Sequence, residues 1–218
     1  MTKKLLPLLV LAALSGAVHA ATPPNTLVVA QGLDDIVSLD PAEANELSSI
    51  QTVPSLYQRL VQPDRDNPEK ITPILAESWE ADAAAKTLTI KLKPDAKFAS
   101  GNPITAADVA YSFERVVKLD KSPGFLITQF GITGDNVAEK AKALDPLTFQ
   151  LTIDKPYAPS FVLNVLTSTV GSVVDKKVVM EHAKAVTPTD EYKYDTDFGY
   201  GWLKTNYAGS GPFKIRDW

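Results

Sequence analysis

The sequence predicts an α/β fold in which strands and helices alternate along the chain. Between residues 87 and 93, apolar and polar residues alternate strictly, as in a strand with one buried face. Residues 147–153 repeat this alternation. Between the two runs, Thr105 and Asp108 have the spacing of a capping box, which begins a helix. The apolar stripe of this helix comprises Val109, Phe113, Val116 and Val117.

Further elements are predicted on either side of this unit. Residues 26–30 are apolar and β-branched, which indicates a buried strand, and residues 213–215 indicate another strand near Trp218. A helix is expected to begin near residue 52 or 53, because Pro54 is tolerated only in the first turn of a helix. Residues 161–166 are expected to form a short helix against the same sheet.

The first twenty residues have the order of a secretory signal peptide. Lys3 and Lys4 precede an apolar run over residues 5–14, and small residues then lead to Ala20. The alternative, a membrane-spanning helix, needs roughly 20 apolar residues, about twice the length of this run. We therefore expect export to the periplasm and cleavage after Ala20.

Charge and cysteine content narrow the possible partners. The chain has 22 basic and 26 acidic residues, a net charge of −4, and loss of Lys3 and Lys4 leaves 20 basic residues against 26 acidic, or −6. This excess of acid argues against nucleic acid and anionic membranes as partners. Because the sequence has no cysteine, no disulfide and no lipid anchor on an N-terminal cysteine can form. We expect a monomer.

The residues needed for the common enzyme chemistries are missing. Beyond the leader the chain has a single histidine, His182, and no cysteine, which excludes Cys-His catalysis and a histidine-rich zinc site. No G-x-S-x-G motif is present. The acidic pair Asp34 and Asp35 could hold calcium, but such a pair in a loop is usually only solvated. We predict no enzyme activity, no catalytic residue, no metal and no cofactor.

Five motifs follow one another along the chain, and their order and spacing are specific. The motifs are Ser38-Leu39-Asp40-Pro41, Leu56-Tyr57 with Leu60-Val61, Leu75-Ala76-Glu77-Ser78-Trp79, a run over residues 88–113, and Gly209-Ser210-Gly211-Pro212-Phe213. Together they resemble the extracellular solute-binding proteins that serve peptide and nickel ABC importers. Members of that family are much longer than this chain.

The resemblance implies a periplasmic binding protein-like fold with mixed sheets, of the class that has an extra small lobe, here as an incomplete bilobal fold. Residues 21–46 would be the first segment of lobe I, residues 47–173 an inserted small lobe, and residues 174–218 the return into lobe I. The remaining lobe, which supplies the other wall of the ligand cleft, is expected beyond residue 218.

The resemblance also implies a function. The chain would belong to the periplasmic substrate-binding component of an ABC transporter, which captures a small solute between lobes and delivers it to the ABC permease subunits of the inner membrane. A short peptide is the expected solute. A nickel chelate, a sugar or an opine remains open as an alternative, as does presentation of the solute to a chemoreceptor.

Four of the predicted ligand contacts are Asn45, Glu46, Leu47 and Phe125. Asn45, Glu46 and Leu47 stand where peptide-binding members pair an extended segment with the ligand, although an ordinary solvated loop is an equal alternative. Phe125 lies near the position where those members place an aromatic residue, although Gly124 occupies the aligned position. A core phenylalanine is the alternative for Phe125.

The other predicted ligand contacts lie in the second half of the chain. Thr167, Ser168 and Thr169 align with the segment where the small lobe meets the cleft, and their hydroxyls could bond a ligand or cap the chain. Gly209 and Gly211 could let backbone N–H groups approach a ligand, or could serve as a flexible return between lobes.

Overall fold

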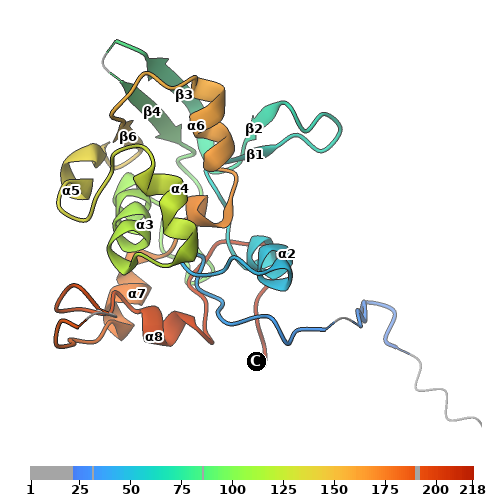
Figure 1. Ribbon diagram of the computed structural model, residues 1–218. Helices are drawn as coiled ribbons and strands as arrows, with labels where there is room; N and C mark the ends of the chain where they lie inside the picture. Colours follow the sequence, from blue (N-terminus) through green and yellow to red (C-terminus); the bar gives the residue numbers. More distant parts are fainter. Residues whose placement is uncertain (1–21, 31, 85, 190–191) are drawn as a thin grey trace, which may run out of the picture. The chain divides into compact units, whose positions relative to one another are not determined.

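The computed structural model describes residues 22–30, 32–84, 86–189 and 192–218 (Figure 1). The predicted signal peptide, residues 1–20, lies outside these ranges. The chain divides into two compact units, residues 1–32 and residues 33–218. Within the described ranges, no helix is both long enough and apolar enough to cross a membrane.

A four-stranded antiparallel sheet forms the centre of residues 33–218. The two alternating runs of the sequence pair with each other, so that Leu88 lies opposite Leu151 and Ile90 opposite Phe149. All four of these side chains are buried, which confirms the two predicted strands and the face that each one buries. In sheet order the strands are β3 (Ala76–Asp82), β4 (Thr87–Leu92), β6 (Thr148–Thr152) and β5 (Ala141–Asp145).

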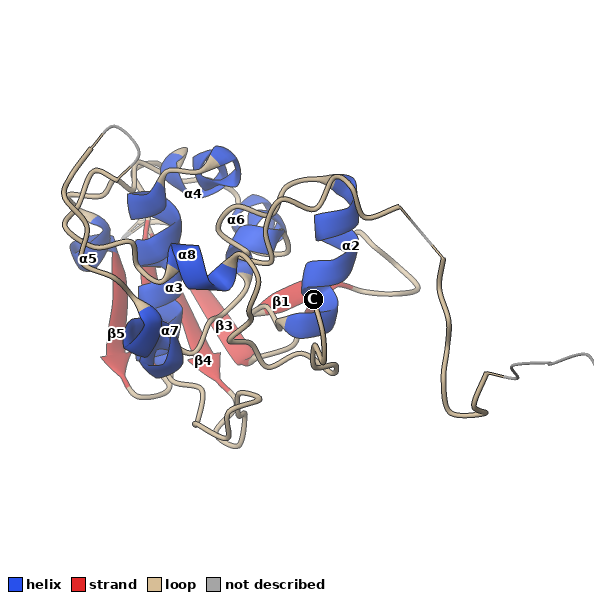
Figure 2. Cartoon of the chain, turned by 90° about the horizontal axis from the view of Figure 1, so that it is seen from below, coloured by secondary structure: helices blue, strands red, loops and turns tan. Residues whose placement is uncertain are grey.

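Helix α3 (Ala106–Leu119) packs against β5 and β6 (Figure 2). The rings of Phe113 and Phe149 lie 5.2 Å apart, so the apolar stripe predicted for the helix meets the apolar face of the sheet. At its first turn, the Asp108 carboxylate accepts the Thr105 backbone N–H at 2.8 Å and the Thr105 hydroxyl at 2.6 Å. The predicted start of this helix is confirmed.

Helix α2 (Leu47–Leu56) begins about five residues before the predicted position. The prediction was wrong because it placed Pro54 in the first turn, whereas Pro54 lies in the last turn of α2. A proline there removes one hydrogen bond to the carbonyl of Ile50. Ile50 is 45 % exposed, so water can satisfy that carbonyl. The helix ends directly afterwards, at Tyr57, which limits the disruption.

Two predicted strands do not form. Residues 26–30 and 213–215 pair with no strand, and most of their side chains are exposed; Leu27 is 87 % exposed and Phe213 66 %, whereas Ile215 is half-buried. An apolar, β-branched run becomes a strand only when another strand accepts its backbone hydrogen bonds. Among the described residues, no such partner lies beside either run.

The remaining elements are short. Two strands form a separate hairpin, and a short helix near the predicted position, α6, lies beside the sheet, where Val162 and Leu88 line one small pocket. The elements are β1 (Val61–Pro63), β2 (Ile71–Pro73), the 3-10 helices η1 (Ser122–Gly124) and η2 (Thr169–Gly171), and the helices α4 (Phe125–Thr128), α5 (Val137–Lys140), α6 (Pro159–Val165), α7 (Lys176–His182) and α8 (Tyr200–Leu203).

A buried ion pair ties the segment before α2 to helix α3. The Asp40 carboxylate receives two hydrogen bonds from the Arg115 guanidinium, at 3.1 and 2.6 Å, and neither side chain is more than 1 % exposed. Arg115 Nε also donates to the Phe198 carbonyl at 2.8 Å. One guanidinium therefore holds together three segments that are far apart in the sequence.

Candidate functional site

Helix α2 and the residues on either side of it form a junction where three distant segments meet. The Gly211 N–H donates to the Leu56 carbonyl at 2.8 Å, and the Val173 N–H donates to the Gln58 carbonyl at 3.0 Å. Arg59 forms an isolated antiparallel bridge with Ser172. The end of α2 is therefore held between the segment after η2 and the segment around Gly211. We call this region the α2 junction.

The structure brings two of the predicted contact segments together at the other end of α2. The Thr169 hydroxyl donates to the Ala44 carbonyl at 2.9 Å, which places residues 167–169 beside residues 45–47. Leu47 is 70 % exposed although it is apolar. The Glu46 carboxylate accepts the Ser49 hydroxyl at 2.9 Å, within the first turn of α2. The two segments thus lie side by side, with Thr169 itself buried, but a ligand contact by any of these residues stays a prediction.

The hydroxyls of residues 167–169 all donate to backbone carbonyls. Thr167 donates to Asn164 at 2.7 Å, and Ser168 donates to Val165 at 2.6 Å. Both carbonyls belong to α6, so these two hydroxyls cap the end of that helix, as one of the two interpretations of the sequence expected. A hydroxyl that donates in this way can still accept a hydrogen bond from a ligand.

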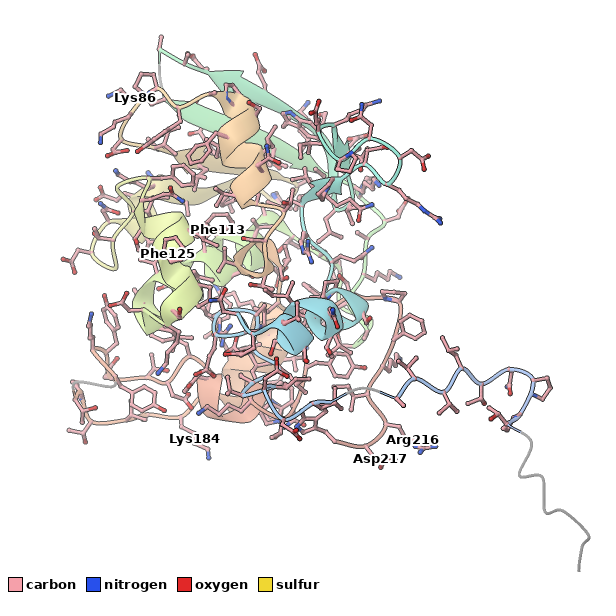
Figure 3. The ribbon with its side chains drawn as sticks, turned by 45° about the vertical axis from the view of Figure 1, so that its right-hand side comes forward. Lys86, Phe113, Phe125, Lys184, Arg216 and Asp217 are labelled. Carbon is pink, nitrogen blue, oxygen red and sulfur yellow. The ribbon has the colours of Figure 1, made fainter. Side chains whose placement is uncertain are left out.

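Phe125 is exposed, so the alternative that it is a core phenylalanine is wrong. Its side chain is 61 % exposed at the first residue of α4, whereas Phe113, also labelled in Figure 3, is buried. A Cβ atom on Gly124 would lie 3.1 Å from the Val116 carbonyl oxygen, which leaves little room for a side chain there. The chain therefore presents its aromatic side chain at residue 125. Contact with a ligand remains a prediction.

Gly209 and Gly211 are packed closely against the end of α2. A Cβ atom on Gly209 would lie 2.1 Å from the Leu56 carbonyl oxygen, and one on Gly211 would lie 2.4 Å from the Leu56 carbonyl carbon. Close packing against the Leu56 backbone thus explains why both positions need a residue without a Cβ atom. The Gly211 N–H is already donated to Leu56. Whether either glycine also approaches a ligand is not tested by these contacts and stays a prediction.

Tyr57 lies at the centre of the α2 junction and is almost completely buried. Its hydroxyl oxygen accepts the Ala208 N–H at 3.3 Å. Burial, and after it the charge of Asp40, raises the pKa of Tyr57 well above its usual value, so the phenol is neutral at physiological pH. Tyr57 therefore acts as a packing group and an acceptor in this region.

An open groove of about 450 Å³ lies along one side of the α2 junction. Two arginines, Arg59 and Arg65, line it. The Arg59 guanidinium donates to the Thr167 carbonyl, which joins the groove to one of the predicted contact segments. Sequence analysis missed both arginines, because no motif spacing connects them. The other residues that line the groove are Pro54, Tyr57, Gln58, Gln62, Pro63, Ile74 and Pro212.

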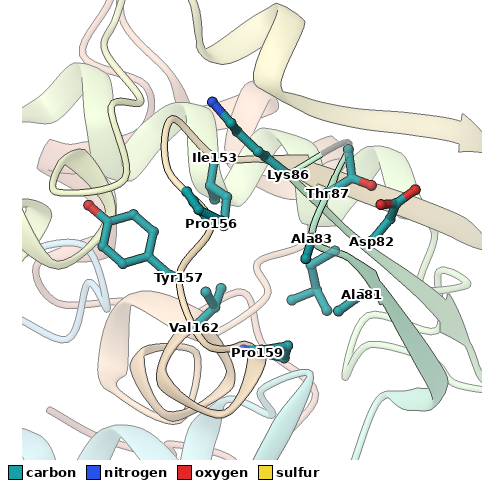
Figure 4. A pocket seen from close by; sticks show the side chains of 11 residues that line it. Ala81, Asp82, Ala83, Lys86, Thr87, Ile153, Pro156, Tyr157, Pro159 and Val162 are labelled. Atoms are coloured by element: carbon teal, nitrogen blue, oxygen red, sulfur yellow. The ribbon is translucent and has the colours of Figure 1, made fainter.

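A second hollow is too small to serve as a ligand site. It lies between α6 and the β3–β4 hairpin and is lined mainly by apolar side chains, among them Ile153, Tyr157 and Val162 (Figure 4). Its volume of about 20 Å³ has room for a single water molecule.

The described residues contain no cluster of three or more side chains suited to hold a metal. His182 is exposed, and its ring stacks on Trp202 at 4.1 Å, in agreement with its predicted place at the surface. Asp35 accepts the Ser48 N–H at 3.2 Å. This contact joins Asp35 to the first turn of α2.

Comparison with known sequences gives matches over most of the chain. Residues 70–218 match the family model described as bacterial extracellular solute-binding proteins, family 5 Middle. The probable D,D-dipeptide-binding periplasmic protein DdpA of Escherichia coli K12 is 34 % identical over 213 residues, which are 96 % of this chain and 37 % of that protein. The glutathione-binding protein GsiB of an Escherichia coli O6 strain is 27 % identical over 194 residues, 89 % of this chain and 32 % of GsiB.

Solved structures match in fold. MoaA of A. tumefaciens R10 in complex with mannopinic acid has a TM-score of 0.63 and 29 % identity, over 84 % of this chain and 33 % of MoaA. Peptide-bound OppA of Listeria monocytogenes has a TM-score of 0.64 at 24 % identity, over 84 % of this chain and 34 % of OppA, and supports the fold alone. The chain spans about a third of the length of these two relatives. The predicted periplasmic binding protein-like fold is confirmed.

Proposed function

Because the chain belongs to the bacterial extracellular solute-binding proteins of family 5, we propose that it forms part of the solute-capturing component of an ABC importer. The observation that carries this proposal is the family match over residues 70–218. The relatives that match are named as binding proteins, and binding of a solute is the activity that we propose.

We propose a peptide-like solute. The names of two relatives point to dipeptides and to glutathione. Asn45, Glu46 and Leu47 support this choice, because Asn45 and Glu46 directly precede α2, Leu47 is its first residue, and the three residues lie beside residues 167–169. An extended backbone can pair with the backbone of a peptide. Phe125 is proposed as an apolar contact for a peptide side chain.

A second candidate is a non-peptide acid. MoaA, which binds mannopinic acid, is 29 % identical to this chain, within the same range of identity as the peptide-binding relatives. Dipeptides, glutathione and mannopinic acid are all carboxylic acids, so both candidates have that group in common.

The proposed mechanism is capture by closure. Binding free energy shifts an equilibrium between open and closed arrangements of two lobes, and the inner-membrane permease recognises the closed one. Residues 47–173 and the return over residues 174–218 would form one side of the cleft. We place the protein in the periplasm, as the names of its relatives suggest, and expect it to act as a monomer that binds no nucleic acid.

A thermal-shift screen tests the proposal. The gene product that contains these 218 residues is heated with di- to pentapeptides and, separately, with mannopinic acid. A ligand at about one hundred times its Kd stabilises a protein by about 2.7 kcal/mol, which raises Tm by several degrees. Stabilisation by peptides supports the first candidate. Stabilisation by mannopinic acid alone would support the non-peptide acid in place of the peptide. If neither class of ligand raises Tm, both candidate solutes are contradicted. Residues 21–218 alone are expected to bind these solutes much more weakly.

A further inference from the structure

The groove along the α2 junction carries positive charge in an acidic protein. Arg59 and Arg65 both line it, and no aspartate or glutamate does. The whole chain has a net charge of −4. The groove therefore has a local positive charge, whereas the chain as a whole is negatively charged.

Neither arginine has a carboxylate partner within the part of the chain that the structure describes. Arg59 is partly buried, and burial lowers the pKa of its guanidinium. It donates to the uncharged Thr167 carbonyl, and a guanidinium has five N–H donors. Asp64, next to Arg65 in the sequence, accepts the N–H groups of Asp66 and Asn67 in the hairpin turn.

The groove lies beside the segments from which ligand contacts are predicted. Arg59 holds the carbonyl of Thr167, and Pro212, directly after Gly211, forms part of the groove wall. The side chains of Gln58 and Gln62 line the same surface and can add amide donors. The groove thus combines two cations with neutral donors, next to the candidate contact surface.

We propose that Arg59 and Arg65 bind the carboxylate group of the captured solute. This inference rests on the proposed function, which supplies a solute that carries such a group. A guanidinium presents paired N–H donors in a plane, which match the two oxygens of a carboxylate. A bound carboxylate supplies the counter-charge that the described residues do not give to Arg59.

The test compares a free acid with its amide. Acetyl-alanyl-alanine and its C-terminal amide are titrated into the purified protein, and the side-chain Nε–H signals of Arg59 and Arg65 are followed by NMR. The free acid should shift both signals saturably. The amide should bind at least about tenfold more weakly, because a charge-assisted hydrogen bond contributes that much or more.

Substitutions assign the effect to the groove. Arg65→Gln, at an exposed position, should weaken binding of the free acid about tenfold while the melting temperature stays unchanged. Arg59→Gln should weaken binding as well, and Arg59→Lys should restore part of it. Lys142→Gln removes the same charge from exposed strand β5 and should leave binding unchanged.

Several outcomes would overturn the inference. Equal affinity for the acid and the amide, or wild-type affinity in Arg65→Gln, would show that the groove does not bind a carboxylate. If inorganic phosphate binds as tightly as the free acid, the groove is not selective for a carboxylate. If peptides stabilise the gene product but the arginine variants bind them normally, the proposed function stands and this inference fails. If the free acid binds in the groove but no solute stabilises the gene product, the groove is an anion site and the proposed function fails.

Discussion

The four-stranded sheet and the α2 junction are held together in different ways. In the sheet, β3 pairs with β4 and β5 pairs with β6 as hairpins, and apolar side chains such as Ile90 and Phe149 meet where β4 and β6 join the two hairpins. In the α2 junction, polar contacts join residues far apart in sequence: Thr169 to Ala44 across 125 residues and Arg59 to Thr167 across 108. The predicted ligand contacts of residues 45–47 and 167–169 lie in the second region. Local patterns thus build the scaffold, and long-range polar contacts assemble the candidate site.

The largest effect is expected at the buried ion pair between Asp40 and Arg115, which joins the sheet region to the α2 junction. Asp40→Asn leaves Arg115 charged and buried without a counter-ion, and removal of one partner of such a pair costs about 3–5 kcal/mol. Urea denaturation should show this loss of unfolding free energy. Asp120→Asn, which breaks the exposed pair with Lys193, is the matched control and should change stability little. Equal effects in the two variants would show that the α2 junction does not depend on Asp40.

A smaller effect is expected where the return segment meets α2. Gly211→Ala places a Cβ atom 2.4 Å from the Ser55 carbonyl oxygen, so the segment must move. Such overpacking costs about 1–3 kcal/mol. The melting temperature should fall, and the Arg59 NMR signal should shift because Pro212 lines the same groove. Gly32→Ala, whose Cβ meets no atom within 4 Å, should leave both unchanged. An unchanged melting temperature in Gly211→Ala would show that the segment around Gly211 can move away from α2 without loss of stability.

The sheet and α3 could be predicted from the sequence because their signals are local. The alternation at residues 87–93 and the spacing of Thr105 and Asp108 each lie within a few residues, and both predictions are confirmed. The strands predicted at residues 26–30 and 213–215 failed because a strand also depends on a partner, which composition does not reveal. Pro54 misled the prediction of the start of α2, because it lies in the last turn, where the helix ends directly afterwards and the loss of one hydrogen bond is tolerated.

The candidate site was predictable only in part. Resemblance to a family pointed to residues 45–47 and 167–169, and the structure places those two segments side by side. Arg59 and Arg65 could not be found in this way, because their common groove is formed by segments from α2, β1 and the return at Pro212. The close packing of Gly209 and Gly211 was also hidden, because it depends on the Leu56 backbone.

The smallest expected effect lies at the start of α3, inside the scaffold. Thr105→Ala removes the hydroxyl that donates to Asp108 at 2.6 Å and should cost about 1 kcal/mol, as substitution of a helix-capping residue usually does. Thr105→Ser keeps the hydroxyl and should retain most of the stability, which separates capping from packing of the methyl group. Both variants should leave the Arg59 NMR signal unchanged, because local capping belongs to the scaffold and not to the α2 junction. A shift of that signal in Thr105→Ala would show that the two regions are coupled through α3, and the contrast between them would then have to be abandoned.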